Sequence, residues 1–265
     1  QFREANGIAV DAEHIYVADY GKHCISVFNR IDSTYVRSWG SRGSGNMQFN
    51  EPKCVAVDDT HVYVADSNNH RVQVFTKAGA YVRSVGSRVE GEDGRLNDPA
   101  GVAVDGEHLV VGSLDGHYIS VFEKGSGRFV RRFGSQGSGQ GQFDGPSGLA
   151  LDGDHVYIAD YNNHRVQVLI KAGVFVRMMG GGRGSGPGQL QDPCGVAVDA
   201  EHVFVCDYGN NRIQIFNKAD GAYVREVRRD AEDGLDAVKP YAIALHGERV
   251  YVTDLRNKRI VVFRS

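Results

Sequence analysis

Aspartate and arginine recur together in this sequence, five residues apart, as side chains that could form an ion pair. The four pairs are Asp66 with Arg71, Asp160 with Arg165, Asp207 with Arg212, and Asp254 with Arg259. One equivalent site has lost both partners, to Ser113 and Tyr118, and another keeps Asp19 but has Cys24 in place of arginine. Joint loss is expected of paired charges, because an unpaired, partly buried charge is costly. We therefore predict four structural ion pairs; the alternative is a ring of arginines offered to a ligand.

Ten histidines invite a search for a metal site. Five of them recur at intervals of 47 residues (His14, His61, His108, His155, His202), and four others recur at the same interval (His23, His70, His117, His164). Zinc ligands must converge to about 2.0–2.3 Å from a single ion. Equivalent positions in successive repeats are instead spread around a ring, so the sequence predicts no metal site.

Catalytic motifs are absent from the sequence. It contains no G-x-S-x-G elbow, G-x-G-x-x-G fingerprint, Walker loop or H-E-x-x-H motif. The Gly-Ser runs at 43–45, 137–141 and 180–188 lead into strands, so they lack the helix N-terminus that favours an anion. We therefore expect a protein that is not an enzyme and that uses no cofactor.

One unit of 47 residues accounts for the whole chain. The segment 61–75, HVYVADSNNHRVQVF, recurs with Asp66 as its anchor, and the equivalent positions are Asp19, Ser113, Asp160, Asp207 and Asp254. A fixed period of about 20–50 residues indicates a repeat architecture. We expect a single domain over 1–265, with repeats at 1–47, 48–94, 95–141, 142–188, 189–235 and 236–265.

Each repeat holds short segments typical of β-strands. In the second repeat they cover 55–58, 62–65, 72–75 and 81–85. The first three are apolar on both faces, as in strands buried on both sides, and the fourth carries an arginine, which suits an outer edge. In a β-propeller, four-stranded sheets called blades pack face to face around a ring, so their inner strands are buried on both sides. The sequence predicts an all-β, six-bladed β-propeller with four antiparallel strands per blade. The last blade is expected to have three strands, because the sixth copy stops after its third segment.

Composition and charge narrow the classes of partner. The formal net charge of −3 is no global signature for nucleic acid or an anionic membrane. No apolar stretch reaches the roughly 20 residues needed to cross a bilayer, and the first residues lack a signal-peptide pattern. The four cysteines show no disulfide or zinc spacing. We expect reduced thiols in a cytoplasmic protein with no membrane contact. A start in mid-repeat is expected of a fragment of a longer chain.

Three motifs in a fixed order carry a family resemblance. They are Gly-hydrophobic-Ala-Val-Asp, Val-Tyr-Val-Ala-Asp and Asn-His-Arg-Val-Gln-Val-Phe. Together they resemble the NHL repeat over all 265 residues, whereas a Trp-Asp repeat is excluded because Trp39 is the only tryptophan. The resemblance implies a six-bladed propeller used as a binding scaffold, often at the C-terminus of tripartite-motif ubiquitin ligases, where it binds protein or RNA. It also implies that a minority of relatives are lyases or secreted enzymes.

Positions that vary between repeats are the candidates for binding. Strand alternation places the loop between the second and third strands on the same face as the loop between repeats. On that face we select Asn6, Lys53, Ser147 and Tyr241 at the channel mouth, Tyr20, Tyr161 and Tyr208 after the anchor, and the cations Lys22, Arg42, Arg95, Arg183, Arg256 and Lys258. The same loops carry the further cations Arg88, Arg228, Arg229 and Lys239 and the acids Glu51, Glu90, Glu92, Asp93, Asp98, Asp115, Asp144, Asp192, Asp230, Glu232, Asp233 and Asp236.

A face of mixed sign that is dotted with aromatics suits a protein or peptide partner. The first hypothesis is therefore a non-enzymatic scaffold that binds a protein segment there and takes no small-molecule substrate. The alternative is single-stranded or stem-loop RNA, because aromatics among cations can stack on bases and neutralise phosphates. A propeller lyase or hydrolase is the third hypothesis.

Overall fold

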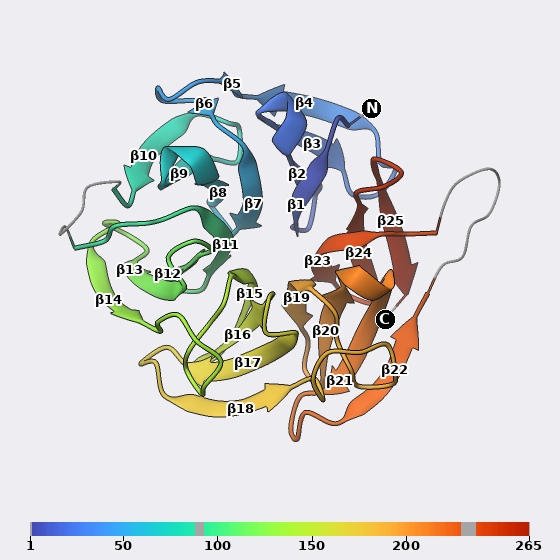
Figure 1. Ribbon diagram of the computed structural model, residues 1–265. Helices are drawn as coiled ribbons and strands as arrows, with labels where there is room; N and C mark the ends of the chain where they lie inside the picture. The colour runs from blue at the N-terminus through green and yellow to red at the C-terminus, as the bar shows by residue number, and fades with distance from the viewer. Residues whose placement is uncertain (1, 88–92, 229–236, 265) are drawn as a thin grey trace.

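The computed structural model describes residues 2–87, 93–228 and 237–264. Within them, six antiparallel sheets are arranged as blades around a central channel (Figure 1). Five blades have four strands and the sixth has three. The prediction of an all-β, six-bladed β-propeller with a three-stranded last blade is therefore confirmed. The helical content of the described residues is limited to three single 3-10 turns, η1 (Tyr20–Lys22), η2 (Ser67–Asn69) and η3 (Tyr208–Asn210).

Each blade adds its strands from the channel outward in chain order (Figure 1). The inner strands are β1 (Ala5–Val10), β7 (Pro52–Val57), β11 (Pro99–Val104), β15 (Pro146–Asp152), β19 (Pro193–Val198) and β23 (Pro240–His246). The second strands are β2 (His14–Asp19), β8 (His61–Asp66), β12 (His108–Ser113), β16 (His155–Asp160), β20 (His202–Asp207) and β24 (Arg249–Asp254). The third strands are β3 (Cys24–Asn29), β9 (Arg71–Thr76), β13 (Tyr118–Glu123), β17 (Arg165–Ile170), β21 (Arg212–Asn217) and β25 (Arg259–Arg264). The outer strands are β4 (Tyr35–Trp39), β10 (Tyr81–Val85), β14 (Phe129–Phe133), β18 (Phe175–Met179) and β22 (Tyr223–Val227).

The ring closes through its inner strands, because each contacts the next and β1 contacts β23. A parallel pair, β5 (Ser41–Arg42) with β6 (Gln48–Phe49), lies in the crossover from blade 1 to blade 2. The inner strands begin earlier than the sequence predicts: β7 begins at Pro52 rather than at residue 55. A β-bulge between Pro52 and Cys54 explains the difference, since an irregular register breaks the continuous apolar pattern used for the prediction.

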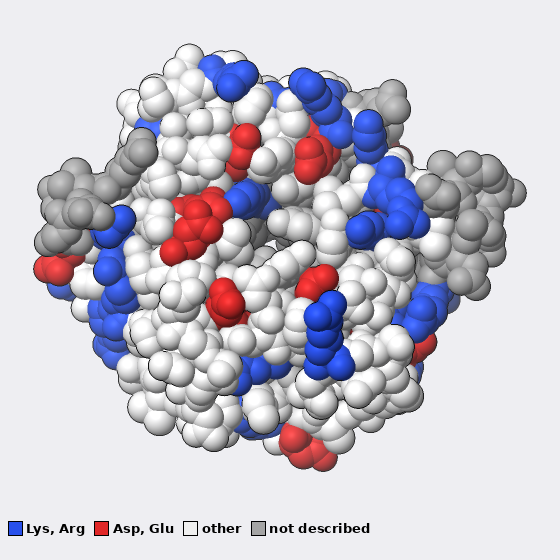
Figure 2. Space-filling view, viewed as in Figure 1, with Lys and Arg blue, Asp and Glu red and all other residues white. Residues whose placement is uncertain are grey.

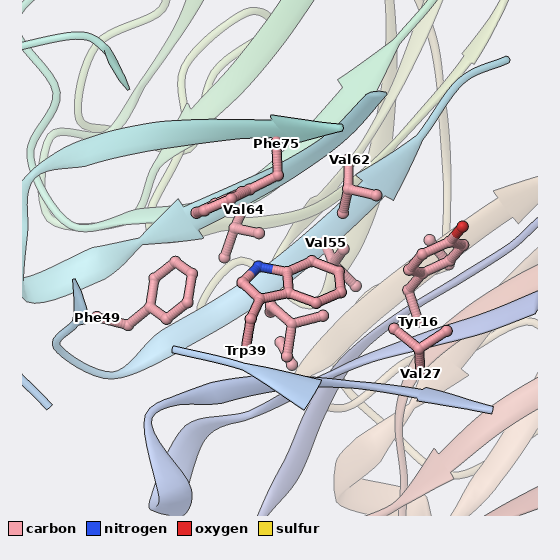
Figure 3. Close-up of a cluster of buried hydrophobic side chains, with 11 residues drawn as sticks. Tyr16, Val27, Trp39, Phe49, Val55, Val62, Val64 and Phe75 are labelled. Atoms are coloured by element: carbon pink, nitrogen blue, oxygen red, sulfur yellow. The ribbon is translucent and has the colours of Figure 1, made fainter. Parts of the chain in front are cut away.

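The apolar core lies between neighbouring blades. Between blades 1 and 2, Trp39 at the end of β4 packs against Phe49 and Val55 (Figure 3). The Phe75 ring completes this cluster, with its centroid 5.8 Å from that of Trp39. Gly40 directly follows Trp39 with a φ of 103°, and a Cβ atom there would lie 2.5 Å from the Phe49 ring. Packing and backbone conformation therefore both require glycine at this position.

Polar contacts join successive blades on the hairpin face, where the turns between inner and second strands lie. A lysine after the third strand of one blade pairs with an aspartate of the preceding blade: Lys77 with Asp11 at 2.9 Å, Lys124 with Asp58 at 3.1 Å, Lys171 with Asp105 at 2.7 Å and Lys218 with Asp152 at 2.8 Å. Outer-strand arginines add to this link, because Arg37 and Arg83 donate to the backbone carbonyls of Lys77 and Lys124. The arginines expected only to protect an edge therefore also connect the blades.

The carboxylate of Asp58 makes this face sensitive to acid. Burial alone would raise its pKa, but hydrogen bonds from the N–H groups of Thr60 and His61, from the Tyr63 hydroxyl and from Lys124 bring the pKa below its ordinary value. A carboxylate with a lowered folded-state pKa contributes its full stability above its unfolded pKa of about 3.9, and this stability is lost progressively as pH falls from that value toward the folded-state pKa.

We therefore expect the urea midpoint of the wild type to exceed that of Asp58→Asn at neutral pH, and the gap to narrow between about pH 5 and pH 3. The measurement is urea unfolding of both proteins at several pH values. A gap that stays constant over this range would contradict the assignment.

No helix in the described parts of the chain is long and apolar enough to cross a membrane.

Candidate binding face

The crossover face carries the loops between second and third strands and the crossovers between blades. It is the face seen in Figures 1 and 2, with the 3-10 turns toward the viewer. Figure 2 shows a hollow at its centre, with acidic side chains in an arc around it and basic side chains gathered over blades 6 and 1. The geometry of this face begins with the buried aspartate that ends the second strand.

Asp66 is the centre of a hydrogen-bonded clamp. Its carboxylate is fully buried and accepts from Arg71 Nε at 2.8 Å, Asn69 Nδ2 at 2.9 Å and Gln73 Nε2 at 3.0 Å. It also accepts the backbone N–H of Asn50 at 2.7 Å, in the crossover. Blades 4 and 5 repeat this arrangement around Asp160 and Asp207.

The clamp fixes the crossover loop as well as the turn. The Arg71 guanidinium donates to the carbonyl oxygens of Gly45 at 2.7 Å and Gln48 at 3.1 Å. Asn69 Nδ2 donates to Gly43 O at 2.8 Å. The four predicted ion pairs have Nε–Oδ2 distances of 2.8 Å (Arg71), 2.8 Å (Arg165), 2.6 Å (Arg212) and 3.0 Å (Arg259). Arg71, Arg165 and Arg212 are therefore engaged with crossover loops and Arg259 with its aspartate, which favours a structural role over contact with a ligand.

Sequence reasoning missed the asparagine and the glutamine of the clamp. They recur three and seven residues after the aspartate, as Asn69, Asn163 and Asn210 and as Gln73, Gln167 and Gln214. Their presence in the same blades as the arginine was the signal that could have revealed them.

Blades 1 and 3 hold their crossover segments in place without the arginine. In blade 1, Asp19 accepts the backbone N–H groups of Arg3 and Glu4, both at 3.0 Å. In blade 3, the Tyr118 hydroxyl donates to Arg95 O at 3.1 Å, and Arg132 lies 4.0 Å from the centre of the Tyr118 ring. The crossovers of these blades are thus held by different contacts, which explains why the ion pair is dispensable there.

Four histidines join the turns of one blade to the crossover of the next. The Nδ1 atoms of His23, His70, His117 and His164 accept the backbone N–H of Glu51, Asp98, Gly145 and Asp192 at 3.1–3.2 Å. An accepting Nδ1 implies that the proton of the neutral ring is on Nε2. These histidines fix the residue that precedes each inner-strand proline. Within the described ranges, no group of histidine, cysteine, aspartate and glutamate is arranged to hold a metal ion.

The first residues of the inner strands form the channel mouth. Below them, three consecutive apolar residues of each inner strand line an axial cavity of ≈ 240 Å³. At the mouth, Asn6 and Ser147 are only 4% and 6% exposed, so these two predicted contacts lie in the wall. Lys53 Nζ lies 2.6 Å from Asp98 Oδ2, in an ion pair whose side chains are 17% and 9% exposed.

Three predicted tyrosines come together on the opposite side of the mouth. Tyr161, Tyr208 and Tyr241 are half-buried and pack against one apolar cluster of blades 5 and 6. The rings of Tyr208 and Tyr241 meet edge to face at 5.9 Å, and Lys239 Nζ lies 4.1 Å from the Tyr208 centroid. Burial and the nearby Asp192 raise the pKa of Tyr161 to about 12. Tyr20 lies apart from them, and its hydroxyl donates to Glu51 Oε2 at 2.6 Å.

The predicted cations divide into two groups. Lys22, Arg256 and Lys258 are exposed on blades 1 and 6, near Arg3, which the prediction omitted. Arg42 lies in β5 at the rim of the ring (Figure 1), and Arg183 is exposed on the crossover after β18, so neither belongs to the basic group of blades 6 and 1. Arg95 is half-buried beside the Tyr118 hydroxyl.

Several charged residues selected from the sequence lie outside the described residues. They are Arg88, Glu90, Glu92, Arg229, Asp230, Glu232, Asp233 and Asp236.

None of the four cysteines has the exposed, low-pKa character of a reactive thiol. All are free, and burial raises the pKa of each. A thiol is nucleophilic as its thiolate, so these four are poor nucleophiles.

The family model described as the NHL repeat matches residues 2–28, 49–75, 143–169 and 190–216. No curated protein sequence matches the chain significantly.

Solved structures share the fold at low sequence identity. Virginiamycin B lyase from Staphylococcus aureus has a TM-score of 0.65 at 14% identity, covering 100% of this chain and 85% of that one. A protein of unknown function from Bacteroides thetaiotaomicron has a TM-score of 0.77 at 17% identity, with coverage of 100% and 70%. A nidogen/laminin complex has a TM-score of 0.68 at 18% identity, with coverage of 91% and 84%. At these identities the similarity establishes the fold alone.

Proposed function

Because this chain is an NHL-repeat β-propeller, we propose that it is a non-enzymatic module that binds a segment of a protein partner on the crossover face. The observation that carries the proposal is the aromatic cluster of Tyr161, Tyr208 and Tyr241, half-buried beside exposed cations. Aromatic side chains supply most of the energy of protein interfaces when they lie at the centre and charges lie around them.

The two-signed charge of the face also favours a protein partner. Lys22, Arg256 and Lys258 lie on blades 1 and 6, whereas Asp98, Asp144 and Asp192 lie along the crossovers of blades 3 to 5. A polypeptide can match both signs along its length, whereas the phosphates of a nucleic acid would be repelled from the acidic arc.

Charge reversal of Arg256 and Lys258 combined with Tyr241→Ala is expected to abolish binding of peptides selected on this protein from a random library. Aromatic anchors typically contribute about 2 kcal/mol or more, and the reversed charges add repulsion. The measurement is fluorescence anisotropy of each selected peptide against wild type and variant.

The matched control reverses two exposed arginines on the hairpin face, Arg128 and Arg249. Peptide binding should survive this control. Equal losses in both variants would place the binding surface elsewhere, and unchanged binding in the first variant would refute the proposal.

RNA is the second candidate ligand, and one observation favours it. The Lys239 ammonium of blade 6 lies over the ring of Tyr208 in blade 5, and single-stranded RNA is bound by such combinations of cations and aromatic rings. RNA binding would show a steep fall in affinity with rising salt, whereas binding of a peptide to a mixed face would depend on salt weakly.

The cellular setting belongs to the same proposal. Four free thiols fit a reducing compartment, so we place the protein in the cytoplasm. A recognition module of this kind would serve a larger protein, such as a ubiquitin ligase. A lyase activity like that named for the Staphylococcus aureus structure is the least supported alternative, because the likeness at 14% identity extends to the fold only.

A further inference from the structure

Acceptor oxygens are in excess where blades 1, 2 and 3 meet the channel mouth. Glu4, Glu51 and Asp98 occupy one register of the repeat there, just before the inner strands, and Lys53 pairs with Asp98. Burial raises the pKa of Glu4, and the carboxylates of Asp19 and Glu51 raise it further, whereas Lys258 and Arg3 oppose them. Burial is the larger cause, and the two neighbouring carboxylates add negative charge at this side of the mouth.

Two oxygens in this region are buried without a hydrogen-bond donor. They are Asn6 Oδ1 and Asp98 Oδ1, on residues that are 4% and 6% exposed. A buried acceptor with no donor costs about 1–3 kcal/mol, so such an atom in a folded protein calls for an explanation. Asp98 Oδ2 already takes the Lys53 ammonium, so Oδ1 needs a donor from elsewhere.

Tyr241 is the second residue of its inner strand, as Asn6 and Lys53 are of theirs, so its side chain lies at the same mouth. Its inner strand β23 contacts β1, which carries Asn6. Burial raises the pKa of the Tyr241 hydroxyl, and the carboxylate of Asp98 in blade 3 adds to the rise. The mouth therefore has an acceptor-rich side and an aromatic side that face one another.

We propose that the channel mouth binds an arginine side chain, presented by the partner segment, between the acceptors of Asn6 and Asp98 and the ring of Tyr241. This inference rests on the proposed function and names the residue that the partner inserts. A guanidinium offers five N–H donors in a plane, so it can serve two separate oxygens and stack on an aromatic ring. An ammonium is a compact, strongly hydrated charge that does not stack in this way.

The direct test titrates the protein with N-acetyl-arginine amide and follows saturable binding by NMR. N-acetyl-citrulline amide is the matched neutral probe, and N-acetyl-lysine amide carries the same charge without the planar fork. We expect a Kd on the order of 1 mM for the arginine probe, with at least tenfold weaker binding of the other two. No saturable binding of the arginine probe, or equal binding of citrulline, would overturn the inference.

Variants locate the site. Asp98→Asn should lower the affinity for the arginine probe at least tenfold. That change leaves Lys53 without its partner. The double variant Lys53→Met/Asp98→Asn removes both charges, so no unpaired lysine remains, and it should weaken binding of the probe as well. Tyr241→Ala should also lower the affinity for the probe. Asp115→Asn removes an exposed charge on the same face and should leave the affinity unchanged. Equal affinity in folded wild type and double variant would overturn the assignment.

Selected peptides separate this inference from the function on which it rests. Replacing arginine by citrulline in a selected peptide should lower its affinity at least tenfold. Peptides that bind the crossover face with no need for arginine would overturn the inference and leave the proposed function standing. A mouth that binds the arginine probe, in a protein for which no peptide can be selected, would support the pocket and refute the proposed function.

Discussion

Replacing Asp207 by serine is expected to lower the free energy of unfolding by about 3–5 kcal/mol, the range for removing one partner of a buried ion pair. The Arg212 side chain is 1% exposed and would keep only Glu226 as a charged partner. Gln214 Nε2 and the backbone N–H of Gln191 would lose the same acceptor. The measurement is urea unfolding, with the midpoint and the slope determined for both proteins.

Blade 3 supplies the matched control for this experiment. The double variant Asp207→Ser/Arg212→Tyr reproduces the natural pair Ser113 and Tyr118, and it leaves no lone charge buried. We expect it to be more stable than the single variant by at least about 1 kcal/mol. Asp220→Ser, on an exposed loop of the same blade, should change stability by less than about 0.5 kcal/mol. A single variant as stable as Asp220→Ser would show that the pair has no structural role.

Adding a fourth strand to blade 6 is expected to stabilise the ring. Val262 in β25 is 42% exposed, whereas its equivalents in the other blades (Val27, Val74, Val121, Val168, Ile215) are at most 2% exposed. In those blades an outer strand with an aromatic residue first, an arginine third and an apolar residue last covers this position. No strand pairs with the outer edge of β25 in the described part of blade 6.

The experiment appends a copy of residues 78–86 after Ser265, which continues the register of blade 2. The copies of Arg83 and Val85 would then pair with Val262 and Ile260, as the originals do with Val74 and Val72. Covering this apolar edge should add on the order of 2 kcal/mol, seen as a higher urea midpoint, and should slow amide exchange in β25. The control extension has serine in place of the copied Tyr81 and Val85. Equal exchange rates in the two extended proteins would refute the idea.

The sequence by itself determined the number of blades, the strands of each blade and the three-stranded last blade. These features are local, because apolar runs of strand length separated by turns recur every 47 residues, and one blade is much like the next. The partnership of Asp66 with Arg71 is also local, since the two residues stand opposite each other across one hairpin. The start of the inner strands was predicted too late, because a bulge interrupts the periodicity there.

Only the tertiary structure decided what the polar residues contact. His70 accepts from Asp98, 28 positions along the chain, and the side chain of Thr253 donates to the carbonyl oxygen of Asn6, 247 positions away. Such contacts follow from the closure of the ring, and no short-range pattern encodes them. The same closure brings Asn6, Asp98 and Tyr241 of three different blades to one channel mouth. Positions that look equivalent in the repeat therefore acquire different surroundings, and the candidate site exists only in the closed ring.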